Sequence, residues 1–279
     1  MLYGPGIEEG FTGGVWIHQS LLQPIWTMKP MSQTMFRFFM KSTGFLICGL
    51  VAVNIAKASV VVTGTRIIYP GDIRQKTIQL TNHDDFPNVV QVWTDVDDPG
   101  STPDQEGAPF IVNPPIFRME PGKGQSLRVI YVGQDLPRDR ESLFHLNVQQ
   151  IPPRSSVHAG KSQILLMLRS RLKIFYRPQG IEGQPDELKE QLKFLLLRHA
   201  QVWSVHVENP SGYYASFAGA QVSVGDRKWA LQTSMIAPRR IAEWEPEEKE
   251  ALPSGPVRLT YWLINDYGAK LEVTHELAP

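Results

Sequence analysis

From Ser59 to its end, the chain consists of short segments in which apolar and polar residues alternate. Between Lys76 and Asn82, for example, Ile78 and Leu80 would lie on one face of a strand, and the intervening threonine and glutamine residues on the other. The 22 glycines and 22 prolines of the chain are spread along it and mark frequent turns. Frequent turns fit many short strands better than long helices, so the pattern predicts an all-β fold.

The alternating segments form two series, joined by a stretch that contains proline and glycine. The first series, residues 59–178, holds about seven strands in roughly 120 residues, which is the size and spacing of an immunoglobulin-like sandwich. Residues 179–185 are the expected linker, and residues 186–279 hold the second series. We therefore expect two immunoglobulin-like β-sandwich domains.

Three segments carry more specific local signals. Ser59–Tyr69 is rich in β-branched residues and is expected to form one strand. Phe110–Met119 is a strand interrupted at Asn113–Pro115, where we expect a bend and a cis proline. Pro185–Lys193 has two leucines at i, i+4 spacing and acidic residues in its first turn, which predicts a short helix.

The first 58 residues differ in character from the rest of the chain. Residues 35–58 combine a positive start at Arg37 and Lys41, a short apolar core and an Ala-Lys-Ala pattern ending at Ala58. This is typical of a secretory signal peptide cut after Ala58. The apolar core is about ten residues long, too short to span a membrane, so a retained anchor is the less favoured alternative. Residues 1–34 show no secretory character and are interpreted as an over-long start.

Few classes of function remain open for the exported part of the chain. The only cysteine of the full chain, Cys48, lies inside the expected signal peptide, so the exported part has neither a disulfide nor a thiol nucleophile. The full chain has a net charge of zero and no polybasic tract, which argues against a nucleic-acid partner. The histidines lack metal-ligand spacing, and no nucleophile motif is present. We therefore expect a protein that is not an enzyme and has no cofactor, metal or small-molecule substrate.

One acidic cluster consists of residues that can bind a metal ion. Asp95, Asp97 and Asp98 lie close together in the sequence, but they lack the spacing of a calcium-binding loop. We expect them to belong to a solvated acidic loop.

The stretch Ile164–Pro178 combines features that conflict in an ordinary strand. It opens with five consecutive large apolar residues and then carries Arg169, Arg171 and Lys173. A strand buried on both faces would not normally hold three cations, and a solvent-facing strand would not hold such an apolar run. We interpret the stretch as a strand that is exposed in the free protein and covered when a partner binds.

Several motifs along the chain resemble those of the PapD-like periplasmic pilus (fimbrial) chaperones. They occur in order from Ser59 to the end of the chain, at Thr65–Gly71, Asn113–Gly122, Leu136–Phe144, Asn147–Pro153, Leu172–Pro178 and Ile264–Gly268. The resemblance implies two immunoglobulin-like domains set at an angle, with a cleft between them. It also implies a client, a pilus subunit whose own immunoglobulin-like fold lacks its last strand, to which the chaperone lends one of its strands.

By motif position, the resemblance assigns the anchor for the subunit's C-terminal carboxylate to Arg66 and Lys173. A cation inside an apolar strand, as at Arg66, is costly unless it has a partner. An ordinary surface arginine is the alternative. A carboxylate held by both cations would fix the register of the subunit strand, because a chain end is a unique mark.

The same resemblance assigns the loaned side chains to Ile164, Leu166 and Leu168. Leu165 and Met167 would then point the opposite way and pack into the chaperone's own core. The alternative is that all five are ordinary core residues.

The spacing along this strand requires one irregularity if the assigned residues share a face. Leu168 and Lys173 are an odd number of residues apart, so on a regular strand they face opposite ways. We expect a bulge or a strong twist at Arg169–Arg171. The preceding loop, Pro153–Lys161, is short, which resembles the short-loop branch of the family.

Three further charges match an interdomain ion network of the family: Glu141, Arg177 and Asp266. Exposed ion pairs contribute little stability, so we expect this network to fix the angle between the domains. The alternative is three unrelated surface charges.

The resemblance implies a periplasmic protein that binds pilus subunits, delivers them to an outer-membrane usher and self-associates when it is free. Two other classes of protein are alternatives. A structural or adhesive surface protein with immunoglobulin-like domains would end in its own donor strand and lack the paired cations. A hydrolase built on a β-sandwich would need a group of catalytic residues, and the sequence shows none.

Overall fold

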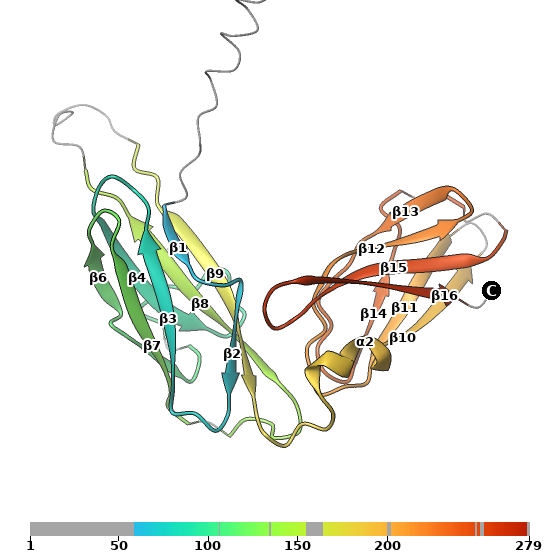
Figure 1. Cartoon of the computed structure of the whole chain (residues 1–279), viewed down its shortest axis with the longest axis horizontal. Helices are drawn as coiled ribbons and strands as arrows, with labels where there is room; N and C mark the ends of the chain where they lie inside the picture. Colours follow the sequence, from blue (N-terminus) through green and yellow to red (C-terminus); the bar gives the residue numbers. More distant parts are fainter. Residues whose placement is uncertain are drawn as a thin grey trace, which may run out of the picture. The chain divides into compact units, whose positions relative to one another are not determined.

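The computed structural model describes residues 59–105, 107–133, 135–154, 164–199, 202–248, 250–251 and 254–277. The expected signal peptide and the residues before it lie outside this part of the chain. Strands dominate the described residues, as the sequence predicts (Figure 1). Within the same residues, no helix is both long and apolar enough to cross a membrane.

The first nine strands form the two sheets of one β-sandwich. One sheet has the order β1-β3-β7-β5, with β1 at Val60–Val62, β3 at Gln75–Asn82, β7 at Gly124–Tyr131 and β5 at Phe110–Asn113. The other has the order β2-β9-β8-β4-β6, with β2 at Arg66–Pro70, β9 at Leu168–Arg177, β8 at Ser142–Ile151, β4 at Asn88–Asp95 and β6 at Ile116–Met119. Apolar side chains from both sheets fill one core, among them Leu80, Leu127, Leu146 and Ile174.

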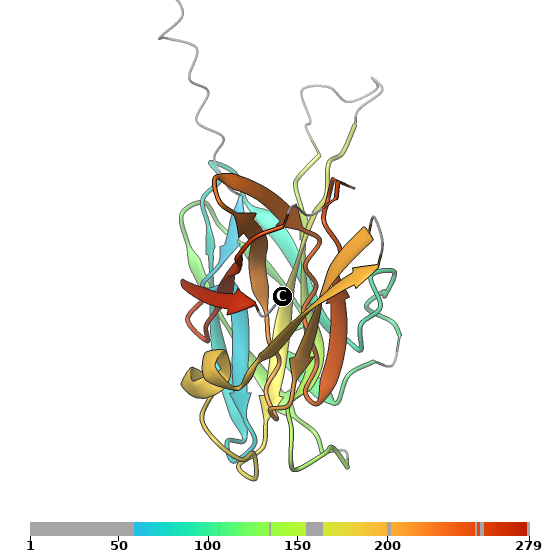
Figure 2. The same ribbon diagram turned by 90° about the vertical axis from the view of Figure 1, so that its right-hand side faces the viewer.

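The remaining strands form a second β-sandwich. One sheet has the order β10-β11-β14, with β10 at Lys193–His199, β11 at Val202–Asn209 and β14 at Arg240–Trp244. The other has the order β13-β12-β15-β16, with β13 at Arg227–Leu231, β12 at Phe217–Val224, β15 at Val257–Ile264 and β16 at Lys270–Leu277. Its last strand, β16, is red in Figures 1 and 2 and pairs along its length with β15. A separate core built around Trp203, Trp244 and Tyr261 holds these sheets together.

The single strand expected at Ser59–Tyr69 is instead two strands in different sheets. β1 pairs with β3, whereas β2 pairs with β9. Between them, Gly64 has a φ of 92°, in the left-handed region that glycine adopts without the steric cost of a Cβ atom. A β-branched run thus ends at one glycine and continues in the opposite sheet.

The other two local predictions agree with the structure. The Asn113–Pro114 peptide is cis, and it separates β5 in one sheet from β6 in the other. The expected helix is a 3-10 turn at Pro185–Glu187 followed by α2 at Leu188–Gln191. Leu188 is buried in the core of the second domain, as the spacing of the leucines predicts.

β9 pairs with β8 without a register shift along its whole length. The bulge predicted at Arg169–Arg171 was therefore wrong. Leu168 and Lys173 lie on opposite faces of a regular strand, because side-chain direction alternates from residue to residue.

Candidate functional site

The two faces of β9 have different compositions. Its even-numbered residues point into the sandwich, where Leu172 and Ile174 are buried. The opposite face carries Arg169, Arg171, Lys173, Phe175 and Arg177. The conflict between apolar and cationic residues in the sequence is resolved by this division, because the cations never enter the apolar core.

Arg66 and Lys173 lie side by side on neighbouring strands. β2 runs parallel to β9, and Arg66 is directly opposite Lys173 in their register. Both side chains are half-buried. Burial lowers the pKa of Lys173, and the neighbouring Arg66 lowers it further. Burial also lowers the pKa of Arg66, although the more distant carboxylates of Asp266 and Glu141 oppose this. The structure therefore brings both predicted anchor residues together.

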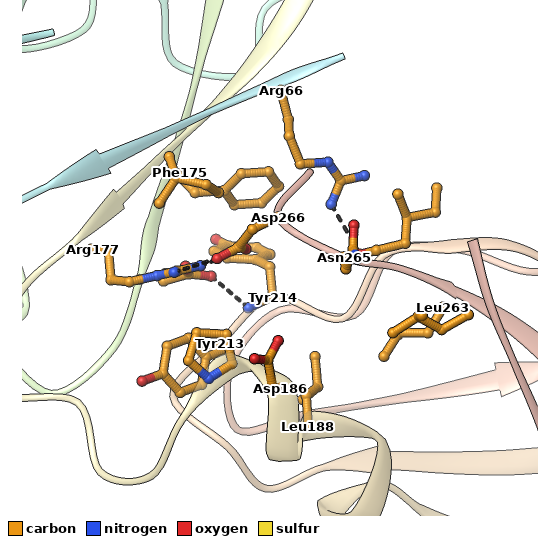
Figure 3. A pocket seen from close by; sticks show the side chains of 15 residues that line it. Arg66, Phe175, Arg177, Asp186, Leu188, Tyr213, Tyr214, Leu263, Asn265 and Asp266 are labelled. Atoms are coloured by element: carbon orange, nitrogen blue, oxygen red, sulfur yellow. Dashed lines mark hydrogen bonds and ion pairs between the residues drawn. The ribbon is translucent and has the colours of Figure 1, made fainter. Parts of the chain in front are cut away.

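The immediate surroundings of Arg66 leave much of its hydrogen-bonding capacity unused. Its Nη1 donates to the carbonyl oxygen of Ile264 at 3.2 Å, and its Cζ lies 5.7 Å from the centroid of the Phe175 ring (Figure 3). Its Nε is buried and has no hydrogen-bond partner among the described residues. Within that part of the chain, no carboxylate forms a direct ion pair with Arg66 or Lys173. Two adjacent, partly desolvated cations without an anion are the chemistry of an anion-binding site.

Arg177 joins the two domains through the predicted ion network. Its Nε donates to Glu141 Oε1 at 2.7 Å. Its two Nη atoms bind both carboxylate oxygens of Asp266, at 2.6 and 2.9 Å (Figure 3). Asp266 follows β15 in the second domain, whereas Arg177 ends β9 in the first.

Burial and charge pairing shift the pKa values of Arg177 and Glu141 in opposite directions. Burial alone would lower the pKa of Arg177, but hydrogen bonds and charges from Asp266 and Glu141 outweigh it and raise that pKa. Burial raises the pKa of Glu141, while Arg177 and the backbone amide of Tyr214, which donates to Glu141 Oε2 at 2.8 Å, oppose it. The alternative of three unrelated surface charges does not hold, because Glu141 is buried and Arg177 is largely so.

The three predicted donor side chains are exposed. Ile164 is 99% exposed, Leu166 71% and Leu168 49%. The prediction that Leu165 and Met167 pack into the core was wrong, since both are exposed as well. The reason is strand pairing: β9 begins only at Leu168, so the four residues before it have no sheet to hold them against the core.

A polar cluster on the outer face of the same sheet was missed in the sequence. Arg171 binds Asp95, which is buried rather than part of a solvated loop, so that expectation was wrong for Asp95. Arg169 binds Asn147 and lies over the ring of Trp93. Alternation places Trp93 and Asp95 on one face of β4, but only the strand order shows that this face meets the arginines of β9. Among the described residues, no group of acidic, histidine or cysteine side chains is arranged to hold a metal ion.

Comparisons with known proteins place the chain in a family. Residues 59–182 match the family described as "Pili and flagellar-assembly chaperone, PapD N-terminal domain", and residues 187–275 match "Pili assembly chaperone PapD, C-terminal domain". The chaperone protein HifB of Haemophilus influenzae is 36% identical over 252 residues, which cover 87% of this chain and 98% of HifB. The chain belongs to the PapD-like family of pilus-assembly chaperones. Its members are chaperones and not enzymes, in agreement with the absence of catalytic motifs in the sequence.

Solved structures of PapD-like chaperones support the same assignment. The crystal structure of the YadV chaperone is 30% identical to this chain and has a TM-score of 0.68. The match covers 79% of this chain and 100% of the YadV chain. The structure of the SafA pilin of Salmonella enterica in complex with the SafB chaperone is 25% identical, has a TM-score of 0.64 and covers 78% of this chain and 96% of the matched one. The two β-sandwich domains predicted from the sequence are confirmed. The short-loop assignment depends on residues 155–163, which lie outside the described part of the chain.

Proposed function

We propose that this chaperone binds a pilus subunit by lending it the stretch from Ile164 to Leu172 as a β-strand, and by holding the subunit's C-terminal carboxylate between Arg66 and Lys173. The observation that carries the proposal is the pair of adjacent, half-buried cations without an anion. They lie at the point where the free edge of β9 ends.

The free edge follows from the pairing of β9. One edge pairs with β8 from Leu168 to the end of the common register. The other edge pairs with β2, but only from Lys173 onward. Residues 168–172 thus have one edge that pairs with no strand in the described part of the chain, and a strand added there would lie in line with β2. Because its carboxylate must end at Arg66, the added strand runs in the same direction as β9.

The inner side of this edge offers an apolar surface to the same partner. A groove between β1 and the start of β9 is lined by Val60, Val62, Val148, Leu168 and Leu172, with Gln150 and Ser170 beside them. Ile164 and Leu166 would continue this inner face if residues 164–167 extend the strand when a subunit binds. Burial of the three donor side chains would contribute roughly 1.5–3 kcal/mol each, which gives the partner affinity without a specific sequence.

The two cations would fix the register of the added strand, which apolar burial alone would not. Hydrogen bonds between charged groups contribute about 1.5–3 kcal/mol each. A slip by one residue would lose both of them and turn every side chain of the added strand to the wrong face. The paired cations also disfavour the alternative of a structural or adhesive surface protein, which has no need of a carboxylate anchor.

The remaining parts of the proposal rest on family resemblance. The SafA–SafB complex supports a pilin as the client. We infer that residues 35–58 direct export to the periplasm and are removed after Ala58, that residues 179–185 link domains at 59–178 and 186–279, and that the loaded chaperone delivers its subunit to an outer-membrane usher. When no subunit is present, the same free edge would pair with a second copy of the chain.

Co-production with pilus subunits tests the carboxylate anchor. Wild-type protein should yield a one-to-one periplasmic complex, and its own chain should begin at Ser59 by mass spectrometry. Lys173→Ala and Arg66→Ala should each lose most of the complex, whereas Lys123→Ala, at an exposed turn, should not. Complex formation by the Lys173 and Arg66 variants at the wild-type level would refute the anchor.

A further inference from the structure

Two arginines of β9 have no role in the carboxylate anchor or in the interdomain network. Arg169 and Arg171 share the outer face with Lys173 and Arg177, but they lie at the start of the strand, next to the donor residues. Their contacts form a connected polar cluster with β4, β8 and the loop after β4.

Arg169 is held by four groups at once. Its Nε and Nη2 both donate to Asn147 Oδ1, at 2.9 and 2.7 Å. Its Nη2 also donates to Ser101 Oγ at 3.0 Å, and its Nη1 donates to the carbonyl oxygen of Pro99 at 3.0 Å. Its Cζ lies 4.7 Å from the centroid of the Trp93 ring, within the range of a cation–π contact. All the oxygen acceptors are neutral, so these contacts fix the position of the Arg169 side chain but do not compensate its charge.

Arg171 is fixed by a buried carboxylate. Its Nη2 donates to Asp95 Oδ1 at 2.5 Å, and its Nε lies 3.4 Å from Asp95 Oδ2. Asp95 also accepts hydrogen bonds from Asn147 Nδ2, Ser101 Oγ and the backbone amide of Asp98. Burial would raise the pKa of Asp95, but these donors outweigh it and lower the pKa to about 2. The carboxylate therefore remains ionised and keeps Arg171 in place.

The cluster lies where β9 has the least other support. Leu168, Arg169 and Ser170 are exposed, although they pair with β8. No described strand pairs with their other edge, because β2 joins β9 only at Lys173. From Leu172 onward, burial of Leu172 and Ile174 holds the strand. In Leu168–Arg171, the described side-chain contacts of β9 are mainly those of the two arginines.

We propose that Arg169 and Arg171 are positioning residues that hold the start of β9 against β8 before a subunit arrives, so that its free edge is already extended. This inference rests on the proposed function, since it explains how the edge that binds the subunit stays extended in the free protein. A strand held in its bound conformation avoids the entropy cost of ordering it during association. The arginines act on the outer face, so they leave the inner face and the edge open to the subunit.

Arg169→Ala is the main test, because it removes the hydrogen bonds without leaving a buried charge unpaired. Amide hydrogen exchange of the free protein should become about tenfold faster in Leu168–Leu172 and stay unchanged in β3 and β7. Arg128→Ala removes an exposed strand arginine from the opposite sheet and should change neither segment. Arg169→Lys keeps the charge but not the planar fork, and its exchange rate should lie between those of Arg169→Ala and the wild type.

Binding is measured with a defined probe, a fluorescent peptide of about ten alternating valine and threonine residues with a free carboxylate. Arg169→Ala should bind it about tenfold more weakly than the wild type, and thermal unfolding should shift by only a few degrees. Unchanged exchange in Leu168–Leu172, or an equal rise throughout the first domain, would overturn the inference. Failure of the wild type to prefer the free carboxylate over an amidated peptide would instead refute the proposed anchor, since the exchange measurement needs no ligand.

Discussion

A cation on a β-strand is tolerated where a partner compensates its charge, and β9 shows three outcomes of this requirement. Arg177 is paired with two carboxylates, Arg171 with one buried carboxylate, and Lys173 with none in the described residues. Their side chains lie on the same face of the same strand. Their partners, and not the residue type, distinguish a charge that is compensated within the described residues from one that is not.

Asp95 gives this distinction a measurable pH dependence. Its pKa is lowered in the folded protein to about 2 from an ordinary value of 3.8. Its ionised form therefore stabilises the fold above pH 3.8 by about 2 kcal/mol, and this contribution is lost as the pH falls toward 2. Asp95→Asn should unfold more easily than the wild type at pH 7, and the difference should shrink between pH 4 and pH 2.

Denaturant unfolding at a series of pH values measures this difference. Asp135→Asn, at an exposed position, is the matched control and should unfold like the wild type throughout. A stability difference between Asp95→Asn and the wild type that persists undiminished at pH 2 would contradict the assignment of the low pKa to Asp95.

At the scale of the element, the fold depends on where strands change sheets or lose their partners. The β-branched segment from Val60 to Pro70 serves both sheets because Gly64 turns it between them. β9 gains its second neighbour only at Lys173. In both cases a continuous stretch of strand-forming residues has a change of partner in the middle, and this change creates the groove and free edge between β1 and β9.

Substitution of Gly64 tests the first of these changes. Gly64→Ala should lower the free energy of unfolding by about 1–2 kcal/mol, because a residue with a Cβ atom is disfavoured at its φ of 92°. Space is not the obstacle, as the nearest atom to an added Cβ is the Arg66 carbonyl oxygen at 3.7 Å. Gly124→Ala, whose added Cβ would make an ordinary contact at 3.4 Å, is the control. Equal unfolding midpoints for Gly64→Ala and the wild type would show that the sheet change does not depend on this backbone conformation.

At the scale of the whole molecule, the interdomain network ties the first β-sandwich domain to the second. Glu141 lies just before β8, Arg177 ends β9 and Asp266 follows β15, so one arginine connects the two sandwiches. Buried pairs of this kind are weak evidence for added stability, but removal of one partner leaves a buried charge uncompensated.

Arg177→Ala should therefore destabilise the protein by about 3–5 kcal/mol, measured by denaturant unfolding. The double variant Arg177→Met with Glu141→Gln should recover much of this loss, since it removes the buried charge together with its partner. Asp266→Asn should cost less than Arg177→Ala, because Asp266 is more exposed than Glu141. A double variant no more stable than Arg177→Ala would show that the network does more than compensate for a buried charge.

The all-β class, the two domains and the short helix could be predicted from the sequence, and the residues of the proposed anchor and of the ion network from the family resemblance. These follow from local properties: side-chain alternation, turn residues, leucine spacing and motifs whose residues are close along the chain. They did not reveal the exposed state of Leu165 and Met167, or the contact between Asp95 and Arg171, which are far apart in sequence.

These points follow from the tertiary structure, because strand pairing joins distant parts of the chain. The alternation of residues along a strand indicates which residues share a face. It does not indicate which strand packs beside that face or at which residue the pairing stops. Leucine is typical of a protein core, yet Leu165 lies outside the sheet and is exposed. Aspartate is typical of a loop, yet Asp95 is buried and accepts a hydrogen bond from Arg171. The register between β8 and β9 sets both outcomes.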